Sequence, residues 1–187
     1  MCTRGNFTKS SEKWLNKEYQ RVCKEELDDE PFVIAVGKSF GAFDAVRAVD
    51  GFGNHQKYPV INTDCMFLID PDDSLDWNNS AKYIIKPNVK RMINFIQNQR
   101  TGPVFDFPRS LRGHYVEAVE GNTSSICQNY AIKKDTYFPE GSEVFSGELV
   151  NHWTIDEYIS TVGYKEKWKL SQLISLAVKD ELPVNLE

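Results

Sequence analysis

The sequence lacks the residue clusters that hold metal ions or build a disulfide framework. Its four cysteines form no CxxC pair and only three histidines occur in 187 residues. A zinc cage or a redox motif needs cysteines, or cysteines and histidines, at short spacing. We therefore expect free thiols, mostly buried, with no metal site and no cofactor motif. The cysteines are Cys2, Cys23, Cys65 and Cys127.

Long apolar stretches and clustered basic residues are also absent. No apolar run is long enough to cross a bilayer, and the opening MCTRGNFTKSSEKW has no apolar core of signal-peptide length. The formal net charge is −5 and the pI is about 5.3. General affinity for nucleic acid or anionic membranes requires clustered Lys and Arg. We expect a cytoplasmic protein without a membrane span and without a nucleic-acid partner.

The composition that remains is typical of a globular protein. Hydrophobic residues make up 41% and charged residues 26% of the chain, with no repeat and no low-complexity segment. A chain of 187 residues fits one domain. We predict a single domain over residues 1–187, of which residues 1–9 are loose.

Residues 31–50, PFVIAVGKSFGAFDAVRAVD, read as a strand, a tight turn and a helix. The run Phe32–Val36 is apolar on both alternating faces, which is typical of a strand in the middle of a parallel sheet. Small apolar residues at helical spacing follow Ser39. The pentapeptide GKSFG between them has the GxSxG pattern, in which the flanking glycines leave room for a turn that lifts the serine hydroxyl clear of the sheet. The motif predicts Ser39 as a nucleophile at a helix N-terminus.

This pentapeptide has two other possible interpretations. GxSxG can arise by chance in a chain with 11 glycines, and it is the flanking strand and helix that favour a functional turn. The Gly-Lys-Ser within it also occurs in phosphate-binding loops, but those loops have a glycine five residues before their Gly-Lys pair. Phe32 stands at that position, which excludes a phosphate-binding loop.

The segment VGKSFGA, residues 36–42, resembles the nucleophile elbow of the α/β-hydrolase superfamily. The resemblance covers residues 12–180 and implies an α/β fold with a mostly parallel sheet flanked by helices. It also implies that the backbone N–H of Phe40 is an oxyanion donor. One helix rather than several strands precedes the elbow, so the fold is a shortened version. The family's second donor has no counterpart in residues 1–30, where only Gly5-Asn6-Phe7 could approach the site.

The rest of the chain alternates between strand, helix and loop patterns, which fits an α/β sheet with right-handed crossovers. The polar stretch 72–86 is expected to be an irregular or partly helical surface excursion, and residues 98–112, with Gly102-Pro103 and Phe107-Pro108, a loop. The last two predicted strands form a hairpin-like or edge pair across Gly121-Asn122, although the first of them could be an excursion. Helices are predicted at Ser11–Leu27 and Tyr164–Lys179, and strands at Tyr58–Ile69, Val89–Gln97, Tyr115–Glu120 and Ser125–Ile132.

A nucleophilic serine needs a histidine within hydrogen-bond reach, and the sequence offers three. His55 follows the elbow helix and is expected at the far edge of the sheet, while His114 begins a short strand. His152 lies in a loop before the last helix. The segment NHWTID around it resembles the histidine segment of α/β hydrolases. We predict His152 as the general base; the alternative is a surface histidine.

The chain order serine, acid, histidine restricts the third residue to the stretch between Ser39 and His152. Asp70 ends the strand that follows the elbow unit, so it should emerge at the same carboxyl edge of the sheet as Ser39. The segment LIDP also resembles that of pancreatic-type lipases, in which the acid follows this strand. Asp70 could instead be only a turn cap before proline. The rival acids are Asp72, Asp73 and Asp106.

Together these residues predict a serine hydrolase that cleaves a carboxylic ester or thioester through an acyl-enzyme, or an amide hydrolase with the same triad. Aromatic residues could line an apolar acyl pocket or equally pack loops onto the sheet; they lie around Trp77, Phe105–Phe107 and Trp153. The alternative is a catalytically weak or inactive hydrolase-like domain that serves binding or assembly. The missing strands would leave the strand at Phe32 with an unpaired edge, which a second copy or a partner chain could cover.

Overall fold

Four parallel strands form the main sheet in the order β1-β2-β4-β6. This comes from a computed structural model, which describes residues 17, 21, 31–51, 60–71, 83–97 and 115–187. A second, two-stranded parallel sheet pairs β3 with β5. The main strands are β1 (Ile34–Lys38), β2 (Thr63–Ile69), β4 (Val89–Gln97) and β6 (Ile126–Ile132), and the short ones are β3 (Tyr83–Ile85) and β5 (Val116–Ala118).

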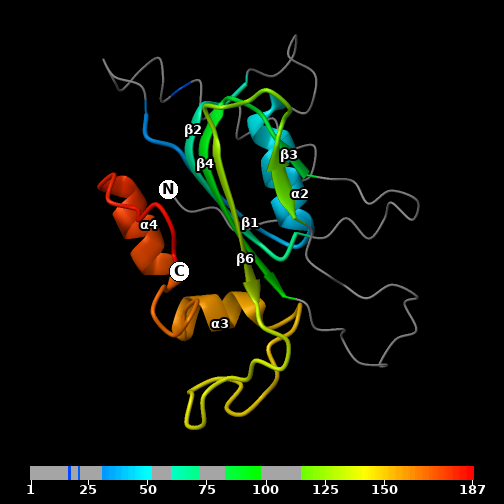
Figure 1. The fold of residues 1–187 in the computed structure, drawn as a ribbon, viewed down its shortest axis with the longest axis vertical. Coiled ribbons are helices and arrows are strands. Elements are labelled where there is room, and N and C mark those ends of the chain that lie inside the picture. The colour runs from blue at the N-terminus through cyan, green and yellow to red at the C-terminus, as the bar shows by residue number, and fades with distance from the viewer. Residues whose placement is uncertain (1–16, 18–20, 22–30, 52–59, 72–82, 98–114) are drawn as a thin grey trace, which may run out of the picture.

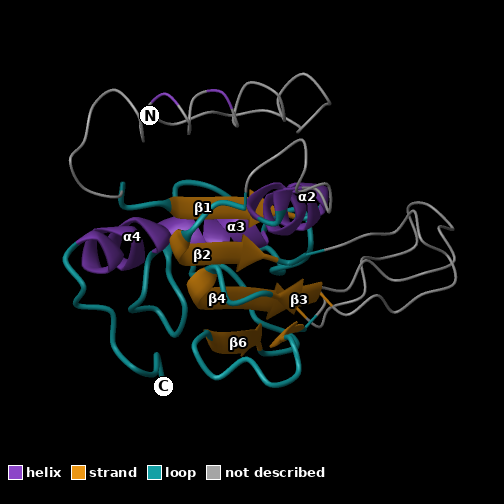
Figure 2. Ribbon diagram, turned by 90° about the horizontal axis from the view of Figure 1, so that it is seen from above, coloured by secondary structure: helices purple, strands orange, loops and turns teal. Residues whose placement is uncertain are grey.

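Helices cover both faces of the main sheet (Figure 1). The helices of the described residues are α2 (Phe40–Val49), α3 (Ile155–Thr161) and α4 (Leu170–Val178). Figure 2, which looks along another direction, shows the strands side by side with β1 at one margin and β6 at the other. The expected α/β class with a mostly parallel sheet is confirmed.

Alternation along β2 divides the core into two clusters, because successive side chains of a strand point to opposite faces. Phe67 and Ile69 belong to the cluster that α3 and α4 complete, while Met66 and Leu68 pack in the cluster of α2. All four side chains are buried. The apolar run of β2 is continuous because helices cover the strand on both faces of the sheet.

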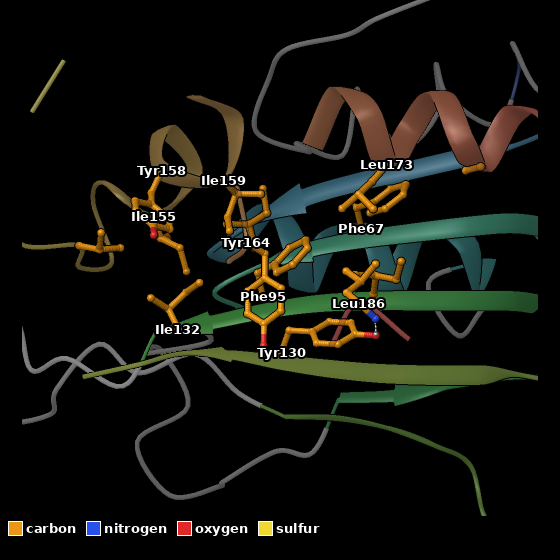
Figure 3. Close-up of a cluster of buried hydrophobic side chains, with 14 of the residues drawn as sticks. Phe67, Phe95, Tyr130, Ile132, Ile155, Tyr158, Ile159, Tyr164, Leu173 and Leu186 are labelled. Carbon is orange, nitrogen blue, oxygen red and sulfur yellow. Dashed lines mark hydrogen bonds between the residues drawn. The ribbon is translucent and has the colours of Figure 1, made fainter. Parts of the chain in front are cut away.

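The larger cluster contains a group of aromatic rings drawn in Figure 3. The centroid of the Tyr130 ring lies 6.0 Å from that of Phe95 and 5.1 Å from that of Tyr164. The Tyr130 hydroxyl accepts a hydrogen bond from the backbone N–H of Leu186, at 3.0 Å. The C-terminal segment is thereby fastened to the same sheet that carries the elbow.

Two strand predictions are confirmed, and the position of a third is wrong. The bounds Val89–Gln97 agree with β4, and the end of the predicted strand Tyr58–Ile69 agrees with β2. The elbow strand runs from Ile34 to Lys38, and within the described residues it pairs with β2 alone. Among these residues it is therefore an edge strand, with Val36 44% exposed, and not the mid-sheet strand that was predicted. The apolar pattern of a strand is the same whether it has one neighbouring strand or two.

The predicted strands Tyr115–Glu120 and Ser125–Ile132 are also confirmed, as β5 and β6, but their predicted pairing across Gly121-Asn122 is wrong. β5 pairs with β3 and β6 with β4, both in parallel. The side chain of Asn129 explains how β5 lies beside β6 without a backbone ladder. Its amide accepts from the N–H of Val116 and donates to the carbonyl of Val116, each at 2.9 Å. One side chain thus occupies the hydrogen-bonding groups that a neighbouring strand would otherwise pair.

The C-terminal helix begins later than predicted. Residues 164–168 form a turn closed by a bridge between Tyr164 and Trp168, in which Lys165 and Glu166 have positive φ angles of 51° and 56°. Helix α3 was not predicted at all. Of the predicted helix Ser11–Leu27 only residues 17 and 21 are described, and both are helical. The loop at 98–112 and residues 72–82 lie outside the described residues, whereas Tyr83–Ile85 form strand β3, which was not predicted. In the part of the chain that is described, no helix has the length and apolarity to cross a membrane.

Candidate active site

Ser39 lies in the turn that joins β1 to α2. Its backbone has φ 53° and ψ −126°, a conformation that L residues rarely adopt, and its N–H donates to the carbonyl of Ile69 at 3.0 Å. That hydrogen bond ties the turn to the end of the neighbouring strand β2. The Ser39 side chain makes no cap bond to α2. Its hydroxyl is therefore left to interact away from the helix.

Gly37 is required by the tightness of this turn, but Gly41 is not. A Cβ added to Gly37 would lie 2.5 Å from the Cα of Ala42 and 2.5 Å from the carbonyl oxygen of Gly41. A Cβ added to Gly41 would meet no atom of the described residues within 4 Å. The prediction that both glycines make room for the chain is correct for Gly37 and wrong for Gly41. Gly41 lies in the first turn of α2 and faces open space.

His152 lies in a short turn directly before α3. The side-chain carbonyl of Asn151 accepts from the N–H of Trp153 at 2.9 Å, and the hydroxyl of Thr154 accepts from the N–H of Asn151 at 3.1 Å. These bonds fix the backbone on both sides of His152. Its ring is 2% exposed. The histidine is thus buried and held, which contradicts the alternative of a surface histidine.

Asp70 lies at the carboxyl end of β2, where its backbone N–H donates to the carbonyl of Phe95 at 2.7 Å. The residue is fully buried and has a φ of 48°, in the left-handed region that Asp and Asn tolerate. Its Oδ1 accepts from the backbone N–H of Gln97 at 3.0 Å. The other oxygen, Oδ2, lies 2.7 Å from Nδ1 of His152.

The three predicted residues meet in one chain of contacts. His152 Nε2 lies 2.9 Å from the Oγ of Ser39, and its Nδ1 lies 2.7 Å from Asp70. An ionised carboxylate can only accept, so Nδ1 carries the proton and Nε2 is left to accept from the serine hydroxyl. This is the tautomer that activates a serine. The groups come from the ends of β1 and β2 and from the turn before α3.

Phe40 and Trp153 are the remaining predicted residues that the structure describes. Phe40 is the first residue of α2, where backbone N–H groups have no acceptor within the helix. Trp153 is 67% exposed, and its ring is nearly perpendicular to that of His152, with the centroids 5.4 Å apart. The other candidates lie outside the described residues: His55, His114, Asp72, Asp73, Asp106, Trp77, Phe105–Phe107 and the segment Gly5-Asn6-Phe7.

Sequence reasoning missed the residues that hold the three in place. The backbone N–H of Gln97 and the side chain of Asn151 have no signature in a sequence, because their roles follow from where the strands end. Lys38 and Asp156 could have been found, since one lies inside the elbow motif and the other inside NHWTID. Lys38 Nζ lies 2.5 Å from the Oδ1 of Asp156.

Cysteine is not a rival nucleophile among the described residues. Burial raises the pKa of Cys65 to about 12, and the nearby Arg91 opposes this only in part. Burial also raises the pKa of Cys127. Both thiols therefore stay protonated and unreactive at neutral pH. The described residues also contain no group of three His, Cys, Asp or Glu side chains that could hold a metal ion.

Comparison of the chain with protein-family models, with curated proteins and with solved structures finds no match.

Proposed function

We propose that this chain is a serine hydrolase that cleaves a carboxylic ester or thioester through an acyl-enzyme. The observation that carries the proposal is the contact chain from Ser39 Oγ to His152 to Asp70, with distances of 2.9 Å and 2.7 Å. Nucleophile, base and orienting acid must lie at hydrogen-bond distance in this order for the chemistry to proceed. The positive φ of Ser39, expected of a nucleophile elbow, is independent support.

In the proposed reaction, Ser39 Oγ attacks the carbonyl carbon of the substrate while its proton passes to Nε2 of His152. The tetrahedral intermediate then collapses, and His152 gives that proton to the departing alcohol or thiol. Water attacks the acyl-enzyme with the same base, which restores the serine hydroxyl and releases the acid. Asp70 remains ionised throughout and stabilises the imidazolium that forms twice in the cycle.

The developing oxyanion would be stabilised at the N-terminus of α2. The backbone N–H of Phe40 is the proposed donor, and the positive end of the helix dipole favours negative charge at the same place. A second donor is not assigned among the described residues. Because one donor is worth about 10²–10³ in rate, a site with Phe40 alone would be slow.

Esters and thioesters are the proposed substrates because they are more reactive than amides. Their carbonyl carbons are more electrophilic than that of an amide, and their leaving groups depart without prior protonation of a nitrogen. Such substrates depend less on a complete oxyanion hole. Turnover of activated esters and thioesters, with little or no turnover of matched anilides, is the expected profile; efficient cleavage of the anilides would make the protein an amide hydrolase instead.

Reaction with a fluorophosphonate tests the proposal directly, since such probes phosphonylate a serine only when it is activated. Folded wild-type protein should gain one probe mass, and peptide mapping should locate it on Ser39. Ser39→Ala and urea-unfolded wild type are the controls and should gain none. Absence of labelling in the folded wild type would contradict the proposed function.

A second candidate, a hydrolase-like domain that serves assembly, has one observation in its favour. Within the described residues β1 is an edge strand; Phe32, two residues before it, is 49% exposed, and Val36, within it, is 44% exposed. Unpaired edges of this kind invite strand pairing with another chain. Size-exclusion chromatography with light scattering distinguishes the two. A monomer with full labelling of Ser39 would leave the assembly role without support.

A further inference from the structure

The side chain of Lys38 connects the elbow to the segment that carries the histidine. Its Nζ donates to the carbonyl oxygen of Trp153 at 3.1 Å and forms an ion pair with Asp156 at 2.5 Å. Lys38 is the last residue of β1 and directly precedes Ser39. Trp153 directly follows His152, and Asp156 lies in the first turn of α3. The residue directly before the nucleophile is therefore bound, through its ammonium group, to the residue directly after the base and to the first turn of α3.

We propose that Lys38 is a positioning residue that holds the turn of His152 at the correct distance from Ser39. This inference rests on the proposed hydrolase function and adds a residue to it. The Ser39–His152 contact joins positions 113 residues apart, and the contacts of Lys38 join positions 115 and 118 residues apart. The lysine thus fixes the same two segments whose separation determines whether the proton can transfer.

Two features of the contact favour positioning over general stabilisation. The side chains of Lys38 and Asp156 are 30% and 44% exposed, and ion pairs of this kind add little to global stability. Proton transfer, in contrast, depends steeply on geometry, so that a displacement of about 1 Å can lower a rate about 10²-fold. Loss of the lysine should therefore impair turnover far more than folding.

The test compares three variants with a matched control. Lys38→Met keeps the aliphatic stem and removes the donor, Lys38→Arg retains a donor and a positive charge, and Asp156→Asn removes the charged acceptor. Lys90→Met is the control. It breaks an ion pair of 2.6 Å with Asp64 near the amino ends of β4 and β2, at the opposite end of the sheet.

The readouts are the rate constant for fluorophosphonate labelling of Ser39, and kcat and KM for a short p-nitrophenyl ester. They are taken on the plateau of the pH–rate profile. Lys38→Met should lower the labelling rate and kcat about 10- to 100-fold with little change in KM or melting temperature. Lys38→Arg should recover most of the rate. Lys90→Met should match wild type, and adding Asp156→Asn to Lys38→Met should cause little further loss.

The pH profile separates positioning from a direct electrostatic effect. Lys38→Met leaves an uncompensated negative charge beside the histidine turn, and Asp156→Asn leaves a positive one. If the pair acted only through charge, the two variants would shift the pH limb in opposite directions and leave the plateau rates unchanged, which would overturn positioning. A fall of both plateau rates supports it.

The outcomes also separate this inference from the function on which it rests. If wild type labels at Ser39 and Lys38→Met labels at the same rate, the positioning role is wrong and the hydrolase proposal stands. If wild type does not label, both proposals fall. If Lys38→Met does not fold, Asp156→Asn and Lys38→Arg decide. A wild-type plateau rate in Asp156→Asn together with a lowered rate in Lys38→Arg would overturn the positioning role of the ion pair. A lowered rate in Asp156→Asn together with a rate near that of wild type in Lys38→Arg supports it.

Discussion

Substitution of Asp70 by asparagine should nearly abolish the proposed hydrolase activity without unfolding the protein. Asparagine has the same shape and tolerates the left-handed backbone of this position, where φ is 48°. The backbone N–H of residue 70 would still donate to the carbonyl of Phe95, since that bond does not involve the side chain. The fold therefore loses only what the second carboxylate oxygen provides.

The backbone N–H of Gln97 determines how the new amide would lie. It donates to Oδ1 of Asp70 at 3.0 Å, so the asparagine should turn its carbonyl oxygen toward Gln97 and its NH₂ toward His152. The imidazole must then accept at Nδ1 and carry its proton on Nε2. In that tautomer it donates to Ser39 and cannot take the serine proton. The opposite amide orientation would leave the buried N–H of Gln97 facing another donor.

The size of the effect follows from two contributions. An unpaired buried donor costs about 1–3 kcal/mol, which is the penalty on the productive amide orientation. Loss of one partner of a buried charge pair costs about 3–5 kcal/mol, which is what the imidazolium loses in the transition state. Their sum of about 4–8 kcal/mol corresponds to about 10³–10⁶ in rate. The same substitution in the serine-protease triad lowers kcat about 10⁴-fold.

The assay is kcat/KM for a short p-nitrophenyl ester, measured for Asp70→Asn beside the same substitution at each rival acid. Asp70→Asn should be the one crippled variant, with a circular dichroism spectrum like that of wild type. A loss of less than about tenfold would refute the reasoning and reduce Asp70 to a turn cap, because asparagine caps turns about as well as aspartate. The rival variants are Asp72→Asn, Asp73→Asn and Asp106→Asn; if Asp106→Asn alone is crippled, the acid follows β4 instead.

Four further predictions follow from the geometry. Ser39→Ala should abolish esterase activity yet shift the melting temperature by only a few degrees, since one hydrogen bond contributes about 0.5–1.5 kcal/mol; full turnover in this variant would remove Ser39 from the mechanism. Activity should rise from acid to neutral pH, because only a neutral imidazole can accept the serine proton, whereas a flat pH–rate profile would argue against a histidine base. Gly37→Ala should destabilise the protein by at least about 1–3 kcal/mol in urea unfolding, because its Cβ would lie 2.5 Å from backbone atoms, while Gly41→Ala should be neutral or stabilising by up to about 1 kcal/mol; equal effects would contradict the turn geometry. With a pKa of about 12, Cys65 should resist iodoacetamide at pH 8 in the native protein and react after unfolding, and rapid native alkylation in peptide mapping would show that it is not buried.

The parts of the fold that follow from local pattern could be predicted from the sequence. The bounds of β4 and the end of β2 are set by continuous apolar runs, and both strands are buried on both faces. Asp70 could be placed because the carboxyl ends of parallel strands share one edge of the sheet. His152 could be found because the chain offers only three histidines.

The parts that depend on distant partners could not be predicted. The pairing of β5 depends on the side-chain amide of Asn129, which no periodicity reveals. The edge position of β1 among the described residues depends on how many strands pair with it, and the apolar pattern of its sequence does not show this number. Helix α3 has seven residues, too few for a helical period to stand out, and the turn before α4 depends on the positive φ angles of Lys165 and Glu166.

The long sequence separation within the site has a consequence for how the protein folds. His152 meets residues 82 and 113 positions earlier in the chain, and those contacts exist only when the four parallel strands have paired and the turn before α3 has docked. Non-local pairings of this kind form late and slowly, because loop-closure entropy is lost before they form. Partly folded chains should therefore contain an ordinary, unactivated serine. The proposed reactivity of Ser39 would then report the last stage of folding, whereas circular dichroism or fluorescence would report earlier ones.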